Sequence, residues 1–141
     1  MSTRSCISAL CEDGKIRATY CHYDGYPEYV GRTLKDNYCE QEKIEKLLAL
    51  GSLSSLGASI DCPEGHSYNN QTEGYTVAYH RDRGEDFEPN EEFEFESSDP
   101  LEVLNGIRSS GNFTYVDYLY YWDGTHWSCM KNWHGECVFG F

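Results

Sequence analysis

The chain is poor in positive charge, because its 141 residues include 11 Lys and Arg against 24 Asp and Glu, a formal net charge of −13. Lys and Arg provide most of the affinity of proteins for phosphate backbones and for anionic membranes. The shortage therefore argues against direct nucleic-acid binding and against docking on a membrane surface. No segment approaches the ~20 apolar residues of a membrane-spanning helix.

Sequence patterns of common catalytic sites are also missing. The chain has no Gly-x-Gly-x-x-Gly, no Gly-Lys-Ser/Thr phosphate loop and no Gly-x-Ser-x-Gly nucleophile elbow. It has no Cys-x2-Cys pair, and its two His-x2-Cys units begin at His126 and His134. Strand alternation would turn His126 away from Cys129, while Cys62-x3-His66 is the remaining combination. We expect no cofactor and no resident metal, and we favour a protein that is not an enzyme.

The first residues carry one Arg and no long apolar run, so they do not resemble a secretory signal. We therefore expect a cytoplasmic protein. In that reducing compartment the seven cysteines are expected to be free thiols, many of them buried as small apolar side chains.

Apolar residues are frequent enough for a core, at 39% of the chain with 15% aromatic. The length suits one domain over residues 1–141. Asp13-Gly14 between two alternating runs predicts a hairpin with a two-residue turn. That turn would place Cys11 opposite Ile16, and Cys6 opposite Cys21 at a distance compatible with a disulfide. A second hairpin at Asp123-Gly124 would join residues 113–122 and 125–130, with Tyr120 opposite Trp127.

Helical periodicity and capping signals predict helices over residues 26–38, 40–50 and 99–106. Alternation predicts short strands over residues 75–80 and 92–96, and residues 52–72 read as a long loop. The order of elements predicts an α+β domain. Its twisted, mostly antiparallel sheet would be built from hairpins, with two to three helices.

The negative charge is concentrated in residues 82–102, which hold ten acids and one base and so carry −9 of the total. Such a segment is often only a solvated face that maintains solubility. It could instead bind the Lys and Arg surface of a nucleic-acid-binding protein, as an electrostatic mimic of DNA. The expected contact residues are Asp82, Glu85, Asp86, Glu88, Glu91, Glu92, Glu94 and Glu96.

A second candidate site lies where the first hairpin leads into the first helix. His22 and Asp24 alternate along the strand end and could share a face, as an acid–base pair or a ligand anchor. Arg4 and Tyr26 would complete a pocket for a small, nucleotide-like molecule, which the protein would sequester or hydrolyse. Structural hydrogen bonding at the strand end is the competing interpretation.

The opening Met1–Ser5, the run Tyr20–Gly31 (YCHYDGYPEYVG) and the run Leu47–Leu56 resemble a group of small, acidic bacteriophage and prophage proteins. The resemblance covers about residues 1–56. It implies a context, a phage accessory protein acting in a bacterial cytoplasm, and no mechanism. Small acidic phage proteins often resemble inhibitors of host defence, such as anti-restriction and anti-CRISPR proteins.

These observations lead to one preferred hypothesis and two alternatives. The preferred one is a non-enzymatic inhibitor whose acidic segment binds a basic, nucleic-acid-handling or defence protein of the host. The first alternative is the small-molecule module just described. The second is a virion or assembly protein. The oligomeric state is not indicated by the sequence.

Overall fold

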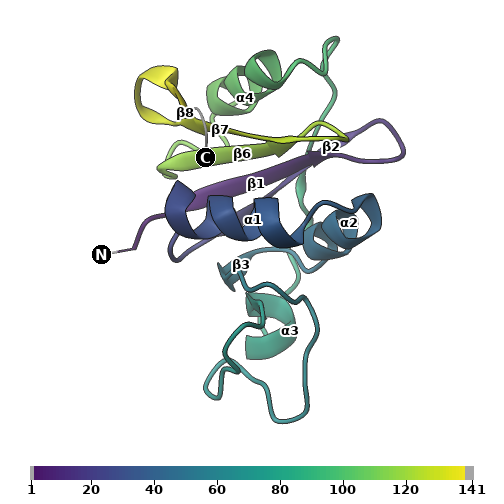
Figure 1. Cartoon of the computed structure of the whole chain (residues 1–141), viewed down its shortest axis with the longest axis vertical. Helices are drawn as coiled ribbons and strands as arrows, with labels where there is room; N and C mark the ends of the chain where they lie inside the picture. The colour runs from purple at the N-terminus through teal and green to yellow at the C-terminus, as the bar shows by residue number, and fades with distance from the viewer. Residues whose placement is uncertain (1, 139–141) are drawn as a thin grey trace.

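The protein, described over residues 2–138 by a computed structural model, is built on one mixed, open sheet (Figure 1). The strand order is β4-β3-β2-β1-β6-β7-β8, with β5 beside β2. The strands are β1 (Ser5–Leu10), β2 (Ile16–Cys21), β3 (Leu53–Ser55), β4 (Val77–Ala78), β5 (Glu91–Phe93), β6 (Tyr118–Trp122), β7 (Trp127–Lys131) and β8 (Cys137–Val138). Only the β1–β6 and β2–β3 pairings are parallel among the described strands, so the expected α+β class with a mostly antiparallel sheet is confirmed.

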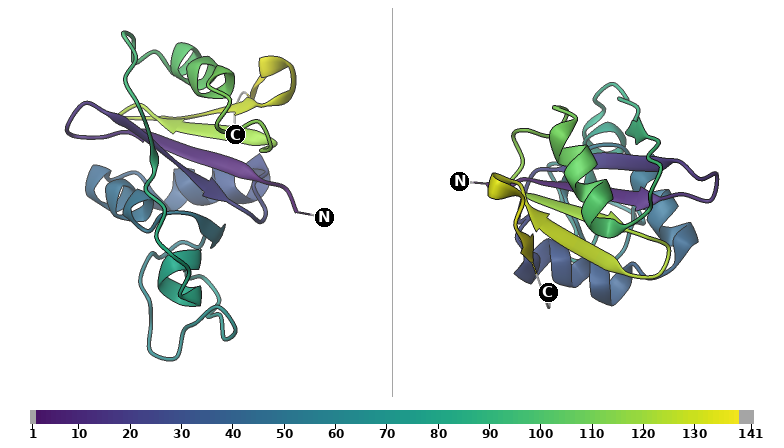
Figure 2. Two further views of the ribbon diagram at one scale, coloured as in Figure 1. Left: turned by 180° about the vertical axis from the view of Figure 1, so that it is seen from behind. Right: turned by 90° about the horizontal axis from the view of Figure 1, so that it is seen from above.

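Helices lie on both faces of the sheet (Figure 2). The helices are α1 (Arg32–Asn37), preceded by a π-helical turn, η1 (Pro27–Gly31), then α2 (Gln41–Ala49), α3 (Tyr79–Arg83) and α4 (Pro100–Ser109), with a 3₁₀ turn, η2 (Trp133–Gly135). α1 and α2 cover one face and α4 covers the other. Within residues 2–138 the longest helix is α4, with ten residues, and no helix is long and apolar enough to cross a membrane.

Because both faces are covered, the central strands bury side chains on each side. Side chains that face α1 and α2 include those of Ile7, Cys21, Tyr120, Leu34 and Leu47. Side chains that face α4 include those of Cys6, Ala18, Leu119, Tyr121 and Leu104. This explains why β6 reads as a nearly continuous apolar run rather than an alternating one.

The predicted register of the first hairpin is wrong by one residue. Gly14 N donates to Cys11 O and Cys11 N donates to Lys15 O, each at 2.9 Å, and Gly14 has φ +85°. The loop therefore has three residues with a glycine bulge, the next most common hairpin connection after the two-residue turn. Cys6 pairs with Tyr20, and Ser5 pairs with Cys21.

A one-residue shift turns side chains to the other face, so Cys6 and Cys21 lie in different halves of the core. The possible Cys6–Cys21 disulfide is thereby excluded. All seven cysteines are free, as expected from the compartment.

The second hairpin is displaced by two residues from its predicted register. Tyr120 pairs with Cys129, and Trp122 pairs with Trp127. The loop is longer than predicted because Asp123 Oδ1 accepts hydrogen bonds from the backbone N–H groups of Thr125 and His126, at 2.8 and 2.7 Å. An even shift preserves the face of each side chain, so the predicted burial of this hairpin holds.

Other boundaries also differ from the predictions. The helix expected over residues 26–38 is divided into η1 and α1, and Tyr26 at its start is exposed. The strand expected over 75–80 is only β4, because the chain turns into α3 at Tyr79. The predicted loop over 52–72 contains β3, and α4 continues past Gly106 to Ser109.

Candidate functional site

The acidic segment forms an extended strap across the molecule, from α3 to α4 (Figure 2, left). We define the acidic strap as residues 84–98. Only Glu91–Phe93 within it is regular structure, namely β5, which pairs with β2. The sequence predicted a strand here, and the structure confirms a shorter one.

Apolar and amide groups hold the acidic strap to the body of the protein at three places. Phe87 lies against Gly51, and Asn90 Nδ2 donates to Leu48 O at 2.8 Å. In the middle, Phe93 packs against the core on the α4 side of the sheet. At the far end Phe95 stacks on Phe93, with ring centroids 5.6 Å apart, and covers Gly106 of α4. The strap therefore has defined contacts along its length.

Seven of the eight predicted contact carboxylates project from this strap and are exposed: Glu85, Asp86, Glu88, Glu91, Glu92, Glu94 and Glu96. Two of them have cationic partners. Glu92 lies 3.2 Å from Arg17 and 3.7 Å from Lys15, and Glu85 lies 3.5 Å from Arg83. Within residues 2–138 no ion pair involves the other five.

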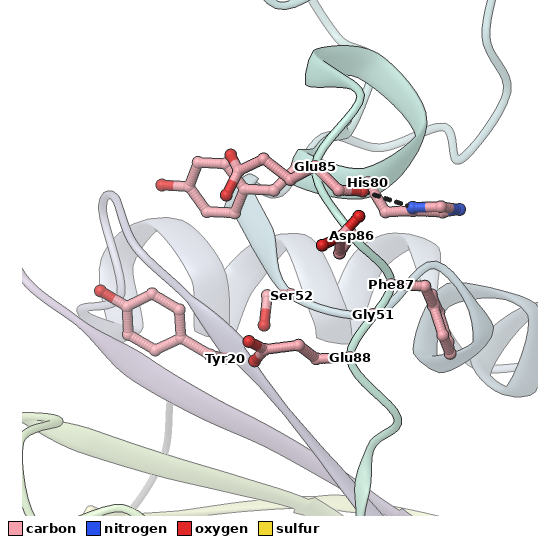
Figure 3. Close-up of a pocket in the computed structure, with 9 residues that line it drawn as sticks. Tyr20, Gly51, Ser52, His80, Glu85, Asp86, Phe87 and Glu88 are labelled. Carbon is pink, nitrogen blue, oxygen red and sulfur yellow. Dashed lines mark hydrogen bonds between the residues drawn. The ribbon is translucent and has the colours of Figure 1, made fainter.

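Three of these carboxylates line a hollow of about 210 Å³ where the strap passes β2 and α3 (Figure 3). Asp86 and Glu88 are directed into the hollow on the side of Tyr20, and Phe87 points away toward α2. Glu85 and Tyr79 complete the wall near α3. Carboxylates beside aromatic rings suit the guanidinium or ammonium group of a partner's side chain.

Asp82, the eighth predicted contact residue, has a structural environment instead, because only 1% of its side chain is exposed. Its carboxylate accepts hydrogen bonds from Arg81 at 2.9 Å and from Ala78 N at 2.8 Å, and it lies 3.6 Å from His66 Nε2. Burial raises the pKa of this carboxyl, but the Arg81 and Ala78 hydrogen bonds outweigh burial and leave the pKa lowered.

Arg81 extends the same network, since its guanidinium also donates to Ile60 O and Thr76 O. Asp82 O accepts a hydrogen bond from Tyr68 N at 3.0 Å. These bonds join distant parts of residues 57–84, which we call the lobe. Asp82 therefore organises the lobe, while the strap carboxylates face solvent.

The second predicted site is only partly assembled by the fold. His22 Nδ1 lies 2.5 Å from Tyr20 Oη, and His22 Nε2 lies 3.3 Å from Ser2 Oγ. Burial and the charge of Arg4 lower the pKa of His22. Both ring nitrogens are thus engaged away from the predicted acid–base partner, Asp24, which is exposed on a backbone with φ +56°.

Arg4 and Tyr26, by contrast, line a hollow of about 480 Å³ at the ends of β1 and β6. We call it the aromatic hollow, and its main lining residues are Arg4, Tyr26, Tyr115, Asp117, Tyr118 and Trp133. The last four come from the start of β6 and the turn after β7. Sequence reasoning missed them because nothing in the local pattern predicts the parallel β1–β6 pairing that brings them to Arg4.

Metal ligation and thiol chemistry find little support in the described part of the chain. Across residues 2–138 no three His, Cys, Asp or Glu side chains are placed to hold a metal ion. His126 is exposed in a turn, and Cys129 is buried in the core. Cys62 Sγ lies 3.6 Å from Asp82 Oδ1, within the lobe network. Burial raises the pKa of Cys21 and Cys129 to about 12, so these thiols are unreactive.

Comparisons with known proteins identify no relatives. No family model, no curated protein and no solved structure matches the chain.

Proposed function

We propose that the protein is a non-enzymatic binder whose acidic strap engages a basic surface of a nucleic-acid-handling protein. The observation that carries this proposal is the arrangement of the strap. Its carboxylates are exposed along an extended segment, and Glu85, Asp86 and Glu88 meet at one hollow. A partner's Arg or Lys entering that hollow would form charge-assisted hydrogen bonds beside the ring of Tyr20.

Exposed aromatic rings within the strap strengthen the proposal. Phe87 and Phe95 are 46% and 37% exposed, although each also contacts the body of the protein. Protein interfaces combine aromatic anchors with a charged rim that steers association. A carboxylate segment kept only for solubility would not require exposed Phe side chains. The resemblance of residues 1–56 to phage proteins places the proposed partner in a bacterial host, where the protein would act as an inhibitor.

The proposal is tested by removing the unpaired charges of the strap. The strap variant carries Asp86→Asn with Glu88→Gln, Glu94→Gln and Glu96→Gln. The matched control removes four exposed acids elsewhere, through Glu28→Gln, Asp36→Asn, Glu64→Gln and Glu73→Gln. Each is used to capture proteins from a bacterial lysate at about 0.05 M and about 0.5 M NaCl, because salt screens exposed charges.

We expect a nucleic-acid-binding protein that is retained by the wild type and by the control at low salt. It should be lost with the strap variant and at high salt. The purified partner should release its DNA or RNA when the wild-type protein is added. Retention of the same proteins by the wild type and the strap variant, or capture without competition against nucleic acid, would contradict the proposal.

A further inference from the structure

The aromatic hollow has the composition of a ligand site, and it lies apart from the carboxylates that line the strap hollow. Trp133, Tyr115 and Tyr26 are 44%, 49% and 37% exposed at its walls. The other two tryptophans, Trp122 and Trp127, are buried in the core. Clustered exposed aromatic rings around a concave surface are typical of sites that stack a planar ligand.

The floor of the hollow is held by backbone hydrogen bonds between β1 and β6. Arg4 N donates to Asp117 Oδ2 at 3.1 Å, and Asp117 N donates to Arg4 O at 2.9 Å. Asn132 Nδ2 donates to Val116 O at 2.8 Å and so ties the turn that carries Trp133 to the start of β6. The rings therefore stand on a preorganised frame, which lowers the entropic cost of binding.

The charges of the hollow differ from those of the rest of the protein. The guanidinium of Arg4 forms no ion pair within residues 2–138. A second hollow of about 490 Å³ shares Tyr115, Asp117 and Trp133 and reaches Arg108. Lys131 Nζ lies 5.8 Å from the centre of the Trp133 ring. In a chain of net charge −13, three cations thus surround one aromatic groove.

We propose that the aromatic hollow binds a nucleoside monophosphate, with the base stacked on Trp133 and Tyr26 and the phosphate on Arg4. Asp117 Oδ2 already accepts the Arg4 N–H, and Asp117 Oδ1 is available to accept a sugar hydroxyl. The volume of about 480 Å³ suits a ligand of this size. Two of the four residues predicted for such a site, Arg4 and Tyr26, belong to it. His22 and Asp24 do not line it, and no hydrolysis is proposed.

Trp133 provides the measurement, because it is the exposed one of the three tryptophans. AMP, GMP, CMP and UMP are titrated while tryptophan fluorescence is recorded, and calorimetry gives the affinity. The corresponding nucleosides and inorganic phosphate are titrated separately. We expect the nucleotide to bind at least about tenfold more tightly than either part, because stacking and the Arg4–phosphate pair contribute together.

Three variants locate the site. Arg4→Gln and Trp133→Leu should each weaken nucleotide binding about tenfold or more. Arg32→Gln, which removes an exposed arginine on α1, should leave the affinity unchanged. Amide and indole NMR shifts of the wild type provide a second readout that needs no variant, and the Trp133 indole N–H should shift on titration.

Several results would overturn the inference. These are no binding of any nucleotide at millimolar concentration, equal affinity in Arg4→Gln and wild type, or NMR shifts that spare Trp133. A 5′-phosphorylated pentanucleotide separates a free nucleotide from the end of a nucleic-acid strand. We expect it to bind more weakly because its further phosphates meet the acidic protein. Tighter binding of the pentanucleotide would overturn the assignment to a free nucleotide.

Discussion

At the scale of single residues, Asp82 shows that an acid within a charged run can have a structural role. Asp82→Asn keeps the size of the side chain but removes the charge that pairs with Arg81. We expect the variant to lose roughly 2–3 kcal/mol of stability in the lobe, as for hydrogen bonds to a charged group. Hydrogen exchange of residues 57–84 measures the loss. Glu73→Gln, an exposed change in the same lobe, is the control, and equal exchange in both variants would contradict the assigned role.

The same carboxyl predicts a pH dependence. The pKa of Asp82 is lowered in the folded state from an ordinary value of 3.8. A lowered carboxyl pKa adds stability that is fully present above the ordinary value and is lost as pH falls through the lowered one. The difference in unfolding free energy between the wild type and Asp82→Asn should therefore be constant near neutrality and shrink below about pH 4. Denaturant titrations at a series of pH values test this, and a constant difference down to about pH 2 would contradict it.

At the scale of elements, the acidic strap depends on a glycine of α4. A Cβ at Gly106 would lie 2.7 Å from the Phe95 ring, so Gly106→Ala must displace that ring. Alanine favours a helix interior by about 1 kcal/mol, which should offset the lost contact in global stability. We expect an unfolding free energy close to that of the wild type but faster hydrogen exchange at residues 91–96. Asn105→Ala, on an exposed position of the same helix, should leave the exchange unchanged.

Elements with strong local signals were predictable, whereas their pairing was not. Asp99, which caps α4 by accepting from Glu102 N, and Gly51, with φ +79° after α2, sit where the sequence placed helix ends. The hairpin registers depended on loop lengths set by Gly14 and Asp123, which a two-residue turn did not anticipate. The candidate sites divide in the same way. The strap was visible in composition, while the aromatic hollow requires the long-range pairing of β1 with β6.

At the scale of the whole molecule, the distribution of charge has a cost in stability. The segment 82–102 carries −9 of the net −13, and four strap carboxylates, Asp86, Glu88, Glu94 and Glu96, have no cationic partner within residues 2–138. Like charges that lie within the Debye length of about 10 Å at 0.1 M salt repel one another. A surface selected only for stability would disperse these charges, whereas a surface that binds a basic partner must keep them together.

The strap variant used to test partner binding should therefore be more stable than the wild type at low ionic strength. If repulsion among the four carboxylates amounts to about 1 kcal/mol, the melting temperature should rise by roughly 3 °C. The matched control, whose four acids are dispersed, should rise less. Scanning calorimetry at about 0.02 M and about 0.5 M NaCl measures both, and screening should remove the difference at high salt. A strap variant that melts at or below the wild type in low salt would show that the carboxylates stabilise the fold, and their clustering would then need no partner to explain it.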